Sequence, residues 1–309
     1  MSILRRIFVK DGRLHPFWRV LLYMPAYLVV TVLFSFVAFA IYGIVLSVTG
    51  NTNEISRLMS GQITLEAKLI LELATLVSVV PLTWLFRRLL DGQSFVSLGF
   101  RRRGPWLADV GLGVVLGFVL MAIIFGVEVG AGWLRVDGFA WATQGVMAVA
   151  TTVLIYLVIY LIVGLTEELS FRGYILVNLR DSFGVVVAVI ASSVLFGLAH
   201  ALNPNFGPVA LLNIALVGVF FCYAYLVTDN LWLPIAYHFS WNFCQGTIFS
   251  FPVSGTGGEG LFLTTLTGAP EWITGGNFGP EAGLLGTAAI LASFLIVWLW
   301  TRVRSGRAA

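Results

Sequence analysis

The sequence predicts an all-α polytopic membrane protein with about eight transmembrane helices. Of its 309 residues, 59% are hydrophobic and only 11% are charged, and the mean hydropathy is +0.94. A soluble fold of this length cannot hide so much apolar surface, because part of every fold stays exposed to water. The apolar stretches are also long and do not alternate with polar residues. Only helices and closed β-barrels form all of their backbone hydrogen bonds within lipid, and apolar stretches without alternation favour helices.

Eight apolar stretches are the candidate helices, because a bilayer core about 30 Å thick needs roughly 20 apolar residues per span. They lie near residues 20–48, 69–86, 107–134, 145–165, 185–202, 208–227, 231–250 and 283–301. The first stretch is too long for the core of a signal peptide and has no small-residue cleavage site after it, which predicts an uncleaved first span.

Basic residues predict the orientation of these spans. They cluster before the first span, after the second, after the fourth and after the eighth, whereas loops of the other parity carry only Arg57, Lys68 and Arg135. By the positive-inside rule both termini are cytoplasmic, and we expect an integral protein of the plasma (inner) membrane. The net charge of +3 is modest and spread over segment ends, which indicates contact with the lipid bilayer rather than with nucleic acid.

The stretch GLTEELSFRGY, residues 164–174, places Glu167, Glu168 and Arg172 directly after an apolar run. On a helix, Glu168 and Arg172 lie on one face and predict an ion pair, while Glu167 points about 100° away. A solvated helix end with a surface ion pair is an equally good interpretation of this motif alone.

Three more polar residues lie in apolar stretches farther along. His200 ends VLFGLAH, and His238 and Asn242 lie one turn apart in LWLPIAYHFSWNF. Each is also consistent with a structural contact between helices. Counting about 1.5 Å per residue from the intervening turns places Glu167, His200, His238 and Asn242 at compatible depths, which favours one site inside the membrane.

The three motifs together resemble a known family. EELSFRG resembles the EExxxR signature, FGLAH the FxxxH signature and HFSWN the HxxxN signature of the CPBP intramembrane proteases, which include the type II CAAX prenyl endopeptidases. The resemblance covers roughly residues 145–250. It implies a CPBP-type protease core in helices 4–7 (145–250). By hydropathy alone, an N-terminal arm with three transmembrane helices (1–144) precedes this core, and a Gly-rich loop with the last transmembrane helix (251–309) follows it.

The resemblance implies an intramembrane endopeptidase. Glu167 and His200 would activate a water for attack on a peptide carbonyl, and His238 and Asn242 would stabilise the oxyanion. Glu168 and Arg172 would orient the site. The substrate would be a membrane-associated protein or a lipidated peptide.

A glutamic mechanism without cofactor is favoured over zinc, because the chain has no HExxH motif and the ligands would come from separate helices. In the zinc alternative the ligands are Glu168, His200 and His238. Two other functions stay open: a non-catalytic scaffold or immunity protein of the same fold, and a proton-coupled transporter.

Several residues receive no role from the sequence. Glu72, Asp109 and Glu128 lie in apolar stretches outside the motifs. Cys222 and Cys244 lack metal-site spacing and are predicted to be small buried hydrophobic residues. The Gly-rich loop 254–279 is predicted to be a flexible external connection.

Overall fold

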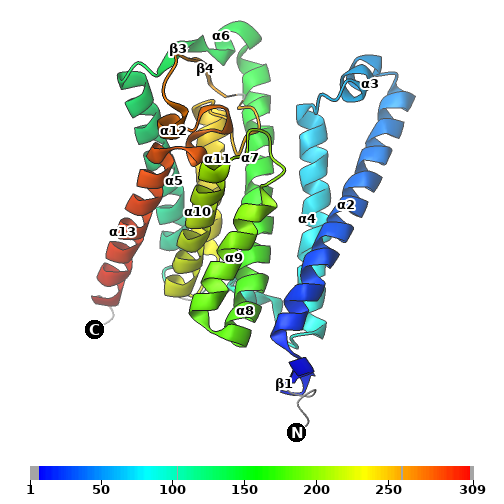
Figure 1. Cartoon of the computed structure of the whole chain (residues 1–309). Coiled ribbons are helices and arrows are strands. Elements are labelled where there is room, and N and C mark those ends of the chain that lie inside the picture. Colours follow the sequence, from blue (N-terminus) through cyan, green and yellow to red (C-terminus); the bar gives the residue numbers. More distant parts are fainter. Residues whose placement is uncertain (1–6, 103, 259, 307–309) are drawn as a thin grey trace.

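The computed structural model describes residues 7–102, 104–258 and 260–306. Its long helices form a bundle, and both termini lie at the same end of it (Figure 1). We call this the terminal end, and the opposite end, where α3 (Thr52–Met59) and β3 (Leu134–Phe139) lie, the distal end.

The N-terminal part of the chain forms three long helices with short elements between them. These elements are β1 (Val9–Lys10), β2 (Arg13–Leu14), α2 (Pro16–Thr49), α3, α4 (Leu65–Leu89), the 3-10 turn η1 (Phe95–Leu98), α5 (Trp106–Gly130), β3 and α6 (Ala140–Gln144). Helix α2 starts with Pro16, which needs no backbone donor there, and it ends at Gly50 in a left-handed conformation.

The middle of the chain is a series of helices that cross back and forth between the two ends. They are α7 (Val146–Glu168), the π-helical segment η2 (Leu169–Ile175), α8 (Leu176–Phe183), α9 (Val185–Ala199), α10 (Pro208–Thr228), α11 (Trp232–Phe243) and the π-helical segment η3 (Cys244–Ile248). Gly184, with φ of 83°, makes the turn between α8 and α9. The chain ends with β4 (Phe262–Leu266), α12 (Glu271–Thr274), the 3-10 turns η4 (Gly276–Phe278) and η5 (Pro280–Ala282), and α13 (Leu284–Gly306).

Six helices of the described chain are long and apolar enough to cross a membrane, rather than eight. They are Pro16–Thr49, Leu65–Leu89, Trp106–Gly130, Val146–Phe183, Pro208–Thr228 and Leu284–Val303. The fifth and seventh predicted stretches do form helices, but α9 has 15 residues and α11 has 12. Helix α9 ends before His200, and α11 changes to a π-helical turn at Cys244, so both are shorter than the predicted stretches.

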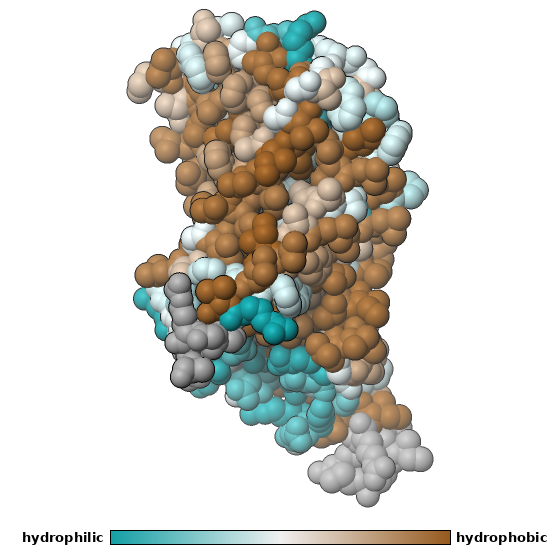
Figure 2. Space-filling model, turned by 90° about the vertical axis from the view of Figure 1, so that its left-hand side faces the viewer, coloured by the Kyte–Doolittle hydropathy of each residue, from teal (hydrophilic) through white to brown (hydrophobic). Residues whose placement is uncertain are grey.

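The outer surface fits lipid contact. Figure 2 shows a broad apolar surface, with hydrophilic side chains gathered below it toward the terminal end. Large apolar side chains of α2 are exposed, among them Val29, Val32 and Phe36. Residues that would be unfavourable in water are favourable against acyl chains, so the protein is an integral membrane protein with several spans.

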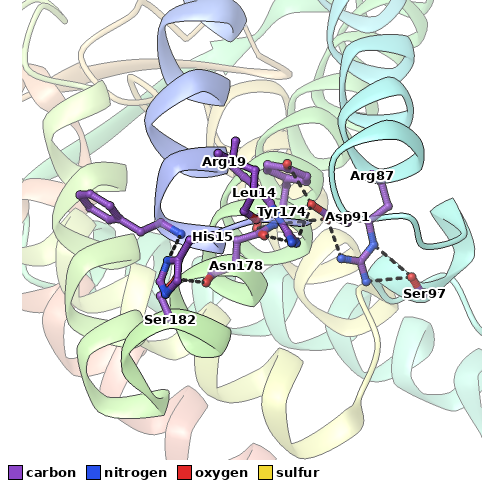
Figure 3. Close-up of polar contacts among 10 residues, drawn as sticks. Leu14, His15, Arg19, Arg87, Asp91, Ser97, Tyr174, Asn178 and Ser182 are labelled. Carbon is purple, nitrogen blue, oxygen red and sulfur yellow. Dashed lines mark hydrogen bonds and ion pairs between the residues drawn. The ribbon is translucent and has the colours of Figure 1, made fainter. Parts of the chain in front are cut away.

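A buried cluster of hydrogen bonds and ion pairs joins α2 and α4 to α8 at the terminal end (Figure 3). We call it the Asp91 cluster. The carboxylate of Asp91 accepts hydrogen bonds from Arg19 (3.2 Å), Arg87 (2.7 Å), Tyr174 (3.3 Å) and Asn178 (3.4 Å). Arg19 belongs to α2, Arg87 to α4 and Asn178 to α8, so one carboxylate joins three helices.

Helices α5 and α11 pack closely through two glycines. A Cβ atom on Gly113 would lie 2.8 Å from the carbonyl oxygen of Leu233, and one on Gly117 would lie 2.6 Å from the backbone nitrogen of Trp241. Gly113 and Gly117 form a GxxxG pattern, which permits such close backbone approach between membrane helices. The hydroxyl of Ser240 also donates to the carbonyl of Val114 at 2.7 Å.

The described residues of the Gly-rich segment form short regular elements, whereas the sequence predicted a flexible loop. Strand β4 pairs antiparallel with β3 at the distal end, and η5 packs against α10 and α13. Glycines permit this compact path because the backbone approaches itself closely: a Cβ on Gly279 would lie 2.0 Å from the carbonyl oxygen of Pro252. We call residues 249–283 the distal cap.

Candidate active site

The motif that begins with Glu167 lies where an α-helix becomes a π-helix. Helix α7 ends at Glu168, and η2 carries Arg172. The predicted ion pair is present, with Arg172 Nη1 at 2.9 Å from Glu168 Oε1, and both side chains are fully buried. The surface-pair interpretation is therefore wrong. π-Helical turns inside longer helices occur frequently at functional sites.

Aromatic rings enclose the guanidinium of Arg172. Its Cζ lies 4.1 Å from the ring centroid of Phe196 and 4.9 Å from that of Phe221. Arg172 Nη2 also donates to the carbonyl of Gly218 on α10 at 3.3 Å. Cation–π contacts and one carboxylate thus stabilise a charge that has no access to water.

His238 joins the two glutamates. Its Nδ1 lies 3.0 Å from Glu168 Oε1, and its Nε2 lies 3.8 Å from Glu167 Oε2. Because Glu168 Oε1 also accepts from Arg172, it is a carboxylate acceptor and His238 Nδ1 is the donor. The ring stacks on Phe221 at 5.2 Å between centroids. Arg172, Glu168 and His238 therefore form a chain of contacts that fixes the imidazole.

His200 has its ring oriented by a backbone group. It follows the last residue of α9, and its Nδ1 lies 2.9 Å from the carbonyl oxygen of Phe196. A carbonyl only accepts, so Nδ1 carries the proton and Nε2 of the neutral ring is an acceptor. No hydrogen bond or ion pair joins Glu167 to His200 among the described residues, and the imidazole in contact with Glu167 is that of His238.

Glu167, His200, His238 and Asn242 line one cavity of about 770 Å³. Asn242 lies one turn beyond His238 on α11, and its side chain makes no hydrogen bond to the described residues. Glu168 and Arg172 are outside the lining, behind Glu167 and His238. Two acceptors therefore line the cavity, the carboxylate of Glu167 at the end of α7 and the imidazole of His200 after α9. The side-chain amide of Asn242 on α11 supplies a donor.

The cavity extends well beyond these four residues. Its wall includes Tyr23, Tyr27 and Leu28 of α2, and Leu195 and Leu198 of α9. In Figure 1, α2 meets the rest of the bundle near α8 and diverges from it toward the distal end. The cavity therefore lies between the N-terminal helices and the motif-bearing helices.

Two carboxylates that the motifs do not include also line this cavity. Glu72 comes from α4, and Glu281 comes from the distal cap. Glu281 Oε2 accepts hydrogen bonds from the backbone nitrogen of Ser254 at 2.7 Å and from its hydroxyl at 2.9 Å. Burial raises the pKa of Glu281, while the hydrogen bonds from Ser254 oppose this shift. Glu281 could not be predicted as a site residue, since it lies 39 residues after Asn242 in a segment without periodicity.

Asp109 and Glu128 lie elsewhere. Asp109 accepts from Asn230 at 3.0 Å and from Trp300 at 3.2 Å, so it joins α5 to the start of α11 and to α13. Glu128 is fully buried near the distal end of α5. Neither lines the cavity. Cys222 and Cys244 are free and buried, as predicted.

A zinc site does not fit the geometry. In the part of the chain that the structure describes, no three His, Cys, Asp or Glu side chains converge in a way that could hold a metal. Of the three ligands that the zinc alternative names, Glu168 and His238 already contact each other, with the Nδ1 proton of His238 between them. We therefore derive no step through a metal.

One comparison with known proteins finds a family. Residues 149–244 match the family model of the Rce1-like type II CAAX prenyl endopeptidases, and this segment contains all six motif residues. No curated protein and no solved structure matches the chain. The resemblance that the three motifs indicate is thus confirmed over residues 149–244, where the chain is similar to a family of type II CAAX prenyl endopeptidases.

Proposed function

We propose that this protein is an intramembrane endopeptidase that hydrolyses a peptide bond of a membrane-associated or lipidated protein. The observation that carries the proposal is the convergence of Glu167, His200, His238 and Asn242 on one cavity. They come from three helices, and their chemical groups are those that peptide hydrolysis needs: acceptors for the protons of a water, and donors for an oxyanion.

In the proposed mechanism Glu167 and His200 activate the water. The water oxygen attacks the carbonyl carbon, and its proton passes to the carboxylate of Glu167 or to Nε2 of His200. The fixed tautomer of His200 supports this role, because its acceptor nitrogen is the one not bound to Phe196. The same proton then moves to the leaving amine as the C–N bond breaks, so that no net charge is left behind.

His238 and Asn242 are proposed to stabilise the oxyanion. Asn242 has an amide donor without a partner among the described residues, and His238 donates from Nε2 when both of its ring nitrogens are protonated. Donors fixed before the reaction contribute about 3–4 kcal/mol each to the transition state. Glu168 and Arg172 act through His238, as positioning residues.

Substrates are proposed to enter from the bilayer. The cavity wall is largely apolar and contains residues of both α2 and α9, which diverge toward the distal end. An acyl or prenyl chain attached to a peptide would be solvated along such a wall as it is in lipid. We also propose that α9 and α11 lie within the bilayer with the six long helices, that both termini face the cytoplasm, and that the membrane is the plasma (inner) membrane.

The chain is proposed to have three parts, residues 1–144, 145–250 and 251–309. The proteolytic core is residues 145–250. Residues 1–144 supply the helices α2 and α4 that form the opposite cavity wall, and residues 251–309 supply the distal cap with Glu281.

A peptide-cleavage assay tests this function. Purified protein in lipid nanodiscs is incubated with a pool of S-farnesyl-cysteine peptides that have randomised apolar residues after the cysteine, and products are identified by mass spectrometry. We expect Glu167→Gln to lower the rate at least about 100-fold, the usual effect of losing a general base. The matched control Glu128→Gln changes another buried membrane carboxylate, one outside the cavity, and should keep the wild-type rate. Equal rates for wild type and Glu167→Gln would reject the proposal.

A second arm separates the glutamic mechanism from the zinc alternative. Hydrolysis that survives exhaustive chelation, in protein without stoichiometric metal, supports the glutamic mechanism. Loss of the rate on chelation with recovery on adding zinc supports the alternative.

A further inference from the structure

The distal part of the cavity contains one cationic side chain. Lys68, in the first turn of α4, is the only lysine or arginine among the described residues that line the cavity. Its Nζ donates to the hydroxyl oxygen of Tyr156 at 3.3 Å and lies 5.7 Å from the centre of that ring. It forms no ion pair with any described residue, although Glu72 lies one turn away on the same helix. Lys68 is half-buried, so its ammonium is available to an anionic ligand in the cavity.

One tyrosine hydroxyl contacts this cation, and two more tyrosines line the same cavity. Tyr156 and Tyr160 stack with centroids 5.7 Å apart on α7, and both line the cavity. The oxygen of Tyr156 accepts from Lys68, so its own proton is free to donate. The hydroxyls of Tyr27 and Tyr160 make no hydrogen bonds within the described chain. One ammonium and three phenol donors therefore face the same space, which is the composition of a site for an anion.

A continuous stripe connects this site with the candidate active site. Tyr156, Tyr160, Val163 and Glu167 all line the cavity, and their spacing places them on one face of α7. Tyr156 and Glu167 are eleven residues apart, which is about 16 Å along a helix. An extended peptide rises about 3.3 Å per residue, so about five residues span this length.

We propose that Lys68, with the hydroxyls of Tyr156 and Tyr160, binds a carboxylate of the substrate peptide about five residues from the scissile bond. This inference rests on the proposed function, because it takes Glu167 as the position of the reacting carbonyl. The carboxylate has two sources, the free C-terminus of a short substrate or an acidic side chain. In either case Lys68 selects the register in which a peptide lies along α7.

The two lysines of the chain allow a direct test. Lys10 and Lys68 are the only lysines in the sequence, and Lys10 lies at the terminal end, where it donates to the carbonyl of Asp181. Reductive methylation of Glu167→Gln protein in nanodiscs, followed by mass spectrometry, reports the accessibility of each amine separately. The Glu167→Gln substitution prevents turnover, so the result does not depend on whether the protein is a protease.

Three peptide pools identify the ligand. All begin with S-farnesyl-cysteine followed by five residues. In two pools all five positions are randomised apolar residues, and the peptides end in a free acid or in an amide. In the third pool the fifth position is glutamate and the peptides end in an amide. We expect the free-acid pool, the glutamate pool or both to slow methylation of Lys68 about 10-fold, with the amide pool without effect and Lys10 unchanged. Slowing by one of the two carboxylate pools alone identifies the source of the carboxylate.

Equal methylation of Lys68 with all three pools, including no slowing by any of them, would overturn the inference. Slowing without peptide when phosphatidylglycerol replaces phosphatidylcholine would also overturn it, because a lipid phosphate would then be the partner of Lys68.

Matched variants separate a binding role from a structural one. Retention of free-acid over amide peptides by Glu167→Gln protein should favour the acid about 10-fold. Lys68→Met keeps the length of the side chain but not its charge, and should bring this ratio to about one, whereas Lys68→Arg should preserve it. Lys10→Met, made at the other end of the bundle, should leave the ratio unchanged. A ratio that Lys68→Met does not alter would contradict the proposal.

Discussion

Arg172 holds a charge where water does not reach, and Glu168 is its counter-ion at 2.9 Å. Replacing one partner of such a pair leaves the other charge buried, which costs about 3–5 kcal/mol. We expect Arg172→Met to lower the free energy of unfolding by this amount. The control Arg135→Met breaks an exposed ion pair with Asp137 and should cost at most about 1 kcal/mol. Detergent unfolding followed by tryptophan fluorescence measures both, and similar losses would contradict the account of Arg172.

Glu281 predicts a pH dependence of stability. Burial raises its pKa in the folded protein above the unfolded value of about 4. The folded state then binds the proton more tightly, so its contribution to stability is complete below the unfolded pKa and is lost as pH rises through the folded pKa. Glu281→Gln cannot lose a proton. Its melting temperature should therefore rise relative to wild type as pH increases through this window. Parallel melting curves across the pH range would show that the carboxyl of Glu281 is not perturbed.

At the scale of elements, the packing of α5 on α11 determines where His238 and Asn242 lie. A Cβ on Gly117 would lie 2.6 Å from the backbone nitrogen of Trp241, so Gly117→Ala forces α11 to move. We expect a loss of about 1–3 kcal/mol in stability and about 10- to 100-fold in hydrolysis. Gly111→Ala, on the same helix with no atom within 4 Å of its Cβ, is the matched control. Equal activity of the two variants would show that the GxxxG contact does not position the site.

Local periodicity made part of the site predictable. The pairing of Glu168 with Arg172 and the common face of His238 and Asn242 follow from helical spacing, and the structure contains both arrangements. The contact of His238 with both glutamates was not predictable, because it depends on how α7 packs against α11. The π-helical turn after Glu168 was not predictable either, since the spacing of apolar residues does not distinguish a single π-helical turn from an α-helical one.

The number of long spans was less predictable than their positions. Apolar runs located all eight helices, but α9 and α11 are shorter than hydropathy indicated. Helix α9 stops at His200, and α11 changes to a π-helical turn at Cys244, and hydropathy detects neither change. The regular elements of the distal cap were missed because glycines in tight turns have the same hydropathy as glycines in a flexible loop.

At the scale of the whole molecule, the Asp91 cluster joins the N-terminal helices to the motif-bearing helices. Asp91→Asn leaves Arg19 and Arg87 buried without a counter-ion, which we expect to destabilise the protein by about 3–5 kcal/mol. Since these contacts join α2 and α4 to α8, hydrogen exchange should increase in α2 and α4 more than in α10 and α13. Asp181→Asn, beside the exposed Arg180, is the control. A uniform increase in hydrogen exchange over all helices would contradict a role of Asp91 in holding α2 and α4 against α8.

For the molecule as a whole, we propose that water activated in this cavity cleaves a peptide inside the membrane. The most direct measurement is hydrolysis of the farnesylated peptide pool in H₂¹⁸O, with mass spectrometry of the products from wild type and from Glu167→Gln. The mechanism predicts one ¹⁸O atom in the new carboxylate formed by the wild type, and a loss of labelled product of at least about 100-fold in Glu167→Gln. Labelled product formed at the same rate by both proteins would contradict it.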